Sequence, residues 1–254
     1  MAFAVSLIRL TLLEALRTRL PWLVVTLIFA SLGAAKFLDQ VAIIEATQIQ
    51  ATLLAALLRI AAVFVVVVFV VTSMVREAGD KVSELLLSQA APRSAYYFGK
   101  LAGYSMVAAL IAIAFSLPLA LFTPNAGLVL WTVSLIFELT LMAAASLFCV
   151  LSLTQVVPAI SAAAGFYLLS RSLATMQLIA ASSLAHDPTW SDRVMNSIVS
   201  AIALLLPGLD RMTLSSWLVV TPDLHMLASV FTQAALYLAL LAGASLFDLY
   251  RRNF

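Results

Sequence analysis

Long uncharged apolar runs separated by short polar segments dominate the pattern of this chain. A transmembrane helix needs about 20 mostly apolar residues, because the hydrocarbon core of a bilayer is about 30 Å thick. The run from Leu101 to Phe137 lacks charge but is too long for one helix, and Thr123-Pro124-Asn125 supplies a turn within it. The sequence therefore predicts an all-α polytopic membrane protein with six transmembrane helices, at residues 20–36, 53–74, 101–122, 127–152, 158–181 and 228–247.

Basic residues are distributed unequally between the two sides of this six-span arrangement. One side carries nine of them: Arg9, Arg17, Arg19, Arg76, Lys81, Arg93, Lys100, Arg251 and Arg252. The other side has only Lys36, Arg193 and Arg211, together with six acidic residues. Because cytoplasmic loops carry an excess of Lys and Arg, we expect both termini and the loop 76–100 in the cytoplasm.

Three segments outside the spans complete a single transmembrane domain of residues 1–254. Residues 1–19 are predicted to form a cytoplasmic or interfacial helix, residues 76–100 a cytoplasmic loop, and residues 182–227 an extracytoplasmic segment.

An amphipathic helix is predicted within residues 182–227. Val194, Ile198, Ile202 and Leu205 recur at helical spacing, and Asp192 is the expected N-cap. A seven-span alternative would use residues 194–206, but these 13 residues are short for a span and would place the C-terminal arginines outside. We therefore expect an outer-surface helix between spans five and six.

Composition supports the membrane assignment and excludes other classes. The chain is 64% hydrophobic and 10% charged, whereas soluble domains carry roughly 25% charged residues. The net charge of +2 gives no argument for nucleic acid. A single cysteine, Cys149, excludes an intrachain disulfide.

The polar loop 76–100 is the segment with the most candidate chemistry. Helix-forming residues run from Lys81 to Gln89, and Pro92 ends that run. A short helix with exposed leucines suits docking into a groove on a cytoplasmic partner. The alternative is a solvated loop lying on the lipid headgroups.

The loop also resembles that of the type-2 ABC exporter permeases. The residues are Arg76-Glu77, Ser83-Glu84-Leu85-Leu86-Leu87-Ser88, Pro92-Arg93-Ser94 and Gly99-Lys100. Residues 205–212 and the ending Arg251-Arg252-Asn253-Phe254 are similar to the branch often labelled multi-copper enzyme maturation permeases. Met212 stands where that branch usually has an aromatic residue, and Lys81-Val82-Ser83 replaces a commoner Gly/Arg-Thr run.

The resemblance implies a permease subunit of an ATP-driven exporter in the bacterial inner membrane. It implies two copies of an ABC ATPase subunit, a second permease subunit as homodimer or heterodimer, and surrounding membrane lipid. The mostly apolar spans favour a lipid-like or amphipathic cargo. It also implies that residues 1–254 form a permease domain and that 76–100 is its coupling loop. The ATPase contacts would be made by Glu77, Glu84, Leu85, Leu86, Leu87 and Arg93.

ATP and Mg are expected on the partner subunit. A phosphate-binding loop requires GxxxxGK[ST], and the chain's single Gly99-Lys100 pair is followed by Leu101. We therefore predict no enzyme activity and no cofactor in this chain.

Two charges are placed at mid-depth in the spans. Glu138 lies about 16 Å below the outer end of its helix and Arg171 about 20 Å above the inner end of the next. A lone charge at that depth costs at least about 2.5–3.5 kcal/mol, so we predict that they form an ion pair inside the bundle, with a cargo pathway as the alternative. Arg59 lies nearer the outer surface and is expected to snorkel.

No metal site is predicted. His186 and His225 are 39 residues apart, with no paired ligand spacing. The alternatives to the ABC assignment are an ATP-independent membrane transporter and a membrane-embedded enzyme or assembly factor. Intramembrane proteases need a serine or metal site within the spans, and such a pattern is missing here. Inverted repeats typical of secondary transporters are not visible either.

Overall fold

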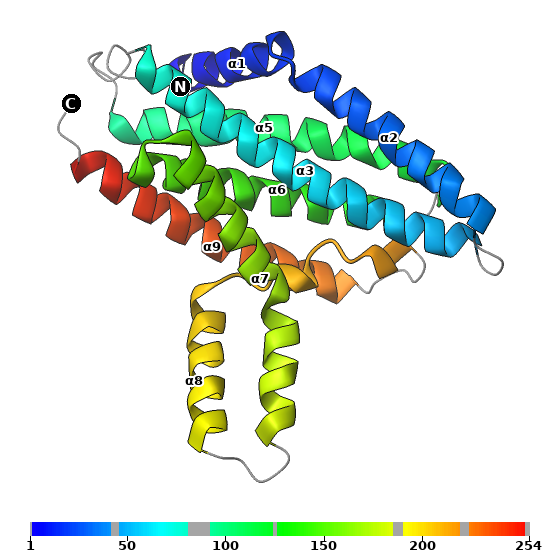
Figure 1. Cartoon of the computed structure of the whole chain (residues 1–254). Coiled ribbons are helices and arrows are strands. Elements are labelled where there is room, and N and C mark those ends of the chain that lie inside the picture. Colours follow the sequence, from blue (N-terminus) through cyan, green and yellow to red (C-terminus); the bar gives the residue numbers. More distant parts are fainter. Residues whose placement is uncertain are drawn as a thin grey trace.

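The computed structural model describes residues 2–41, 46–80, 92–123, 126–184, 190–218 and 224–251. Within these ranges every regular element is helical and no strand occurs (Figure 1). The elements are α1 (Ala2–Arg17), α2 (Leu20–Val41), α3 (Ala46–Gly79), α5 (Arg93–Ala120), α6 (Ala126–Leu153), α7 (Val156–Leu184), α8 (Trp190–Leu205), the 3-10 turns η1 (Leu209–Arg211) and η2 (Ser215–Leu218), and α9 (Leu224–Arg251).

Six of these helices are long and apolar enough to cross a membrane: α2, α3, α5, α6, α7 and α9. The predicted number of spans is therefore confirmed, and the chain has the architecture of a multi-pass membrane protein. The helices extend beyond the predicted boundaries at the loop 76–100, because α3 continues to Gly79 and α5 begins at Arg93. Helix-forming residues such as Glu77 and Ala78 let the backbone continue through the polar region.

Helix α6 occupies the centre of the bundle. It contacts α3, α5, α7 and α9, and every residue from Leu141 to Leu147 is buried. Three alanines and a serine in this stretch allow close approach of the neighbouring helices, which is how membrane helices gain packing contacts.

Helix α1 packs along α5 (Figure 1). Leu7, Thr11 and Ala15 form its buried stripe at intervals of one turn. Gly103 of α5 lies so close to Thr11 that an added Cβ would come within 2.9 Å of the threonine side chain. The N-terminal segment is therefore packed onto the helical bundle, and its expected position at the membrane interface stays a prediction.

The second half of α7 and α8 form an antiparallel hairpin that projects from the bundle (Figure 1). The predicted helix is present, but Asp192 is not its N-cap, because α8 begins at Trp190 and Asp192 lies in the first turn. Such start signals locate the end of a helix only to within one or two residues. Of the predicted face, Val194 and Ile198 are exposed, whereas Val199 is buried.

The residues after α8 fold back rather than cross. Segments Arg193–Leu205 and Leu209–Leu218 meet at 66° and would give a seventh span only if joined. Arg93, at the start of α5, contacts the last turn of α9. The end of α9 therefore lies on the same side as the loop 76–100, which requires an even number of crossings between α5 and that end. Residues 193–218 thus add no further crossing. We call them the re-entrant segment, because the chain turns back onto the bundle there.

Candidate functional site

The base of the loop 76–100 contains a buried ion pair. The Glu77 carboxylate of α3 contacts the Lys100 ammonium of α5, and their side chains are only 9% and 6% exposed. The Tyr96 hydroxyl donates a 3.0 Å hydrogen bond to the same carboxylate. Glu77 thus joins the two helices that flank the loop, because both of its partners come from the first two turns of α5.

The preceding residue joins α3 to a third helix. Arg76 forms an ion pair with Glu14 of α1 at 2.5 Å, with the arginine side chain 55% exposed. An exposed pair of this kind contributes little stability, at about 0–1 kcal/mol. The pair matters because it positions α1. The adjacent Arg76 and Glu77 together connect the end of α3 to both α1 and α5.

Arg93 fixes the other end of the loop to α9. Its guanidinium donates to the carbonyl oxygens of Leu249 and Tyr250, at 3.0 and 3.2 Å, and lies over the Tyr250 ring. Carbonyl groups in the last turn of a helix lack partners within the helix, so this contact satisfies them. Arg93 therefore attaches the start of α5 to the C-terminal end of the chain.

These contacts extend into the bundle below the loop. The Ser73 and Tyr104 hydroxyls share a 2.9 Å hydrogen bond between α3 and α5, and the Tyr104 ring packs edge-to-face on Phe69. The two helices that carry the loop are thus joined over several turns.

The residues predicted to contact an ATPase subunit divide into two groups. Glu84, Leu85, Leu86 and Leu87 lie outside the described residues, as does the predicted run Lys81–Gln89. Glu77 and Arg93 flank that segment and face their own chain. The predicted ATPase contact stays a prediction. The inward direction of Glu77 and Arg93 follows from the helical continuation of α3 and α5, which the motif does not show.

A second polar cluster lies inside the bundle. Glu138 Oε1 and Arg171 Nη1 are 3.7 Å apart, and Glu138 is completely buried. The structure therefore brings together the two intramembrane charges that the sequence placed at the same depth. Arg171 Nη1 also donates to the carbonyl oxygens of Leu209 and Met212, the latter at 2.8 Å. The arginine thus connects α6 and α7 to the re-entrant segment.

Arg59 binds the same segment from α3. Its Nη1 donates a 2.7 Å hydrogen bond to the Thr213 carbonyl, and the Thr213 amide donates to Ser134 Oγ at 2.9 Å. The expectation that Arg59 snorkels is wrong, because the residue is only 9% exposed and is covered by the re-entrant chain. Thr213 adopts a left-handed φ of 50°, which turns its amide and carbonyl toward these two partners.

No family model matches this sequence. No curated protein matches it either. The functional argument therefore rests on the fold and on the two polar sites.

Together, Arg59 and Arg171 provide the hydrogen-bond donors that an irregular backbone needs inside a membrane protein. Non-helical chain at membrane depth is tolerated only where its polar groups find partners within the protein or in water. Both carboxylate oxygens of Glu138 lack a hydrogen-bond partner among the described residues, as does the Tyr167 hydroxyl. The cluster thus combines two guanidinium groups with one carboxylate, and its clear effect is to hold the re-entrant segment against α3, α6 and α7.

The described part of the chain contains no cluster of three or more metal-ligating side chains. His186 and the side chain of His225 lie outside the described residues.

The sequence does contain a signal that could have placed Arg59 correctly. Arg59 is the only charged residue in the predicted span 53–74, and such residues usually face the interior of the bundle.

Proposed function

We propose that this chain is the membrane-spanning permease subunit of an ATP-driven transporter of the type-2 ABC exporter class. The loop 76–100 would couple it to a separate ATPase chain. The observation that supports this proposal is the attachment of both ends of the loop: Glu77 to Lys100 on one side and Arg93 to the end of α9 on the other.

This attachment suits a loop that transmits force. Displacement of residues 81–91 acts directly on the ends of α3 and α5, which flank them. Because Glu77 and Arg76 connect α3 to α5 and α1, and Arg93 connects α5 to α9, four helices would move with the loop. A solvated loop resting on lipid headgroups has no need of a buried ion pair at its base.

We also propose the location, the partner subunits and the cargo of this chain. Both termini and the loop 76–100 lie in the cytoplasm of a bacterial inner membrane. Two ATPase subunits hold ATP and Mg, and a second permease subunit, identical or related, completes the transporter. The cargo is lipid-like or amphipathic, in keeping with the apolar faces that the spans present to the bilayer.

A second function has one observation in its favour. The buried Glu138 carboxylate without a hydrogen-bond partner among the described residues is the kind of group at which an ATP-independent transporter binds its driving ion. Dependence of transport on a co-purifying ATPase distinguishes the two functions, because the alternative needs no such chain.

The coupling role is tested with Leu86→Asp in the protein purified together with its associated chains. Burial of a leucine contributes about 1.5–3 kcal/mol, so the exchange should weaken ATPase association by at least about tenfold. Co-purification and transport in proteoliposomes measure the effect. Ser88→Asp, which adds the same charge in the same segment, is the control and should retain association. Normal association in Leu86→Asp, or no co-purifying ATPase at all, would contradict the proposal.

Orientation is tested with single cysteines at Ser88 and Ser191 in a Cys149→Ser background. We expect a membrane-impermeant maleimide to label position 191 in intact cells and position 88 only after permeabilisation. The reason is the excess of basic residues around the loop 76–100. Labelling of both positions from the same side would refute the proposed topology.

A further inference from the structure

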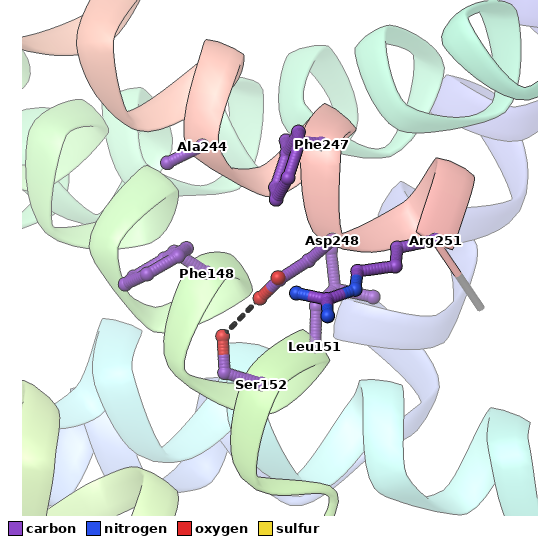
Figure 2. Close-up of a pocket in the computed structure, with 7 residues that line it drawn as sticks. All are labelled: Phe148, Leu151, Ser152, Ala244, Phe247, Asp248 and Arg251. Carbon is purple, nitrogen blue, oxygen red and sulfur yellow. Dashed lines mark hydrogen bonds between the residues drawn. The ribbon is translucent and has the colours of Figure 1, made fainter.

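The ends of α6 and α9 enclose a pocket on the side of the bundle that carries the loop 76–100 (Figure 2). Phe148 and Leu151 of α6 and Phe247 of α9 form its apolar walls. The Phe247 side chain is 65% exposed, so the apolar wall continues onto the outer surface of the bundle. The pocket therefore opens toward the region that lipid occupies in a membrane.

The same pocket contains an acid and a base that do not pair with each other. Ser152 Oγ of α6 donates a hydrogen bond to Asp248 Oδ2 of α9 (Figure 2). Arg251 lies one turn further along α9 and also lines the pocket. Among the described residues its guanidinium has no carboxylate within 4.0 Å. Two opposite charges that do not pair with each other thus line the same pocket.

The surrounding backbone determines which charge suits each position. Both α6 and α9 end at this pocket, and the C-terminal end of a helix carries a partial negative charge that favours cations. That field adds to the charge of Asp248. The carbonyl groups of Leu249 and Tyr250 near the end of α9 already accept hydrogen bonds from Arg93. The guanidinium of Arg251 therefore remains a donor suited to an anion in the pocket.

We propose that this pocket binds a phospholipid whose headgroup carries a primary ammonium. The phosphate lies on Arg251, the ammonium on Asp248, and an acyl chain along Phe148, Leu151 and Phe247. A purely anionic lipid would place no cation on Asp248, and a water-soluble ligand would leave the apolar walls without a partner. The site is independent of the transport function proposed above.

The test compares phosphatidylethanolamine with phosphatidylglycerol of the same acyl chains, offered in equal amounts to the purified protein. Retained lipid is counted by native mass spectrometry. We expect phosphatidylethanolamine to be preferred by about fivefold, a ratio in keeping with one partly exposed charge-assisted hydrogen bond. Asp248→Asn should bring the ratio to about one. Arg251→Gln should lower the retention of both lipids, since each has a phosphate.

Asp80→Asn and Arg9→Gln serve as matched controls, because both residues are exposed and neither lines the pocket. Ser152→Ala leaves every charge in place and should reduce the preference partially, which keeps the test decisive if Asp248→Asn fails to fold. An equal or reversed preference in the unaltered protein would overturn the proposal. The proposal would also be overturned if the Asp248 and Arg251 variants retained lipid as the controls do. Lipid retained only after removal of associated protein chains would overturn it too, because the pocket would then belong to a protein partner.

Discussion

Lys100→Gln should lower the free energy of unfolding by about 3–5 kcal/mol, the range found when one partner of a buried ion pair is removed. The exchange leaves the Glu77 carboxylate buried with the Tyr96 hydroxyl as its remaining hydrogen-bond donor in the described structure. The loss is measured by titrating the protein, purified in a mild detergent, with a denaturing detergent. Near-ultraviolet circular dichroism monitors the unfolding.

The control for this prediction is the neighbouring exposed pair. Arg76→Gln breaks the contact with Glu14, and we expect it to cost less than about 1 kcal/mol because that arginine is largely in solvent. The double variant Glu77→Gln/Lys100→Gln should regain part of the stability, since no uncompensated charge stays buried. If the Lys100→Gln variant were as stable as Arg76→Gln, the Glu77–Lys100 pair would not stabilise the protein as a buried ion pair.

Arg171→Gln should destabilise the protein more than Glu138→Gln. Removal of the guanidinium strands the buried Glu138 charge and also leaves the carbonyl groups of Leu209 and Met212 without their donor, so we expect about 3–5 kcal/mol. Glu138→Gln leaves Arg171 with those carbonyl partners and should cost less. The double variant should recover part of the Arg171→Gln loss, since the stranded carboxylate is gone. Thermal unfolding of the four proteins forms a double-mutant cycle.

Chemical labelling provides a second measurement of the same prediction. A cysteine at Met212, which is completely buried, should become reactive toward a maleimide when Arg171 is replaced. The same cysteine in the otherwise unaltered Cys149→Ser background is the control and should react slowly. Equal rates in the two proteins would show that Arg171 does not hold the re-entrant segment.

The six spans were predictable because length and the absence of charge are sufficient evidence for a transmembrane helix. The proximity of Glu138 and Arg171 was predictable for a related reason, since both lie in adjacent helices joined by a short turn and their depths follow from the helical rise. The boundaries of α3 and α5 were less accurate. Polar residues at a membrane surface can continue a helix as well as end it.

Contacts between distant segments were not predictable from the pattern. Arg93 and Leu249 are 156 positions apart, and Arg59 and Thr213 are 154 positions apart. Hydrophobic periodicity reports which face of a helix is apolar, but not which later segment folds back onto it. The mistaken expectation for Arg59 has this origin. The inward direction of Glu77 has another, since it follows from the helical continuation of α3 and α5 past the predicted boundaries.

The distance along the chain between Arg59 and Thr213 also sets an order of events during synthesis. Ribosomes add about 5–20 residues per second, so α3 emerges about 8–30 seconds before the carbonyl group that its arginine finally binds. Over that interval the guanidinium of a newly inserted helix needs water, lipid phosphate or the insertion machinery as a temporary partner. The last steps of folding therefore belong to the final quarter of the polypeptide, and a ribosome that stalls before residue 213 leaves a membrane-inserted chain with a charge that its own structure cannot yet neutralise.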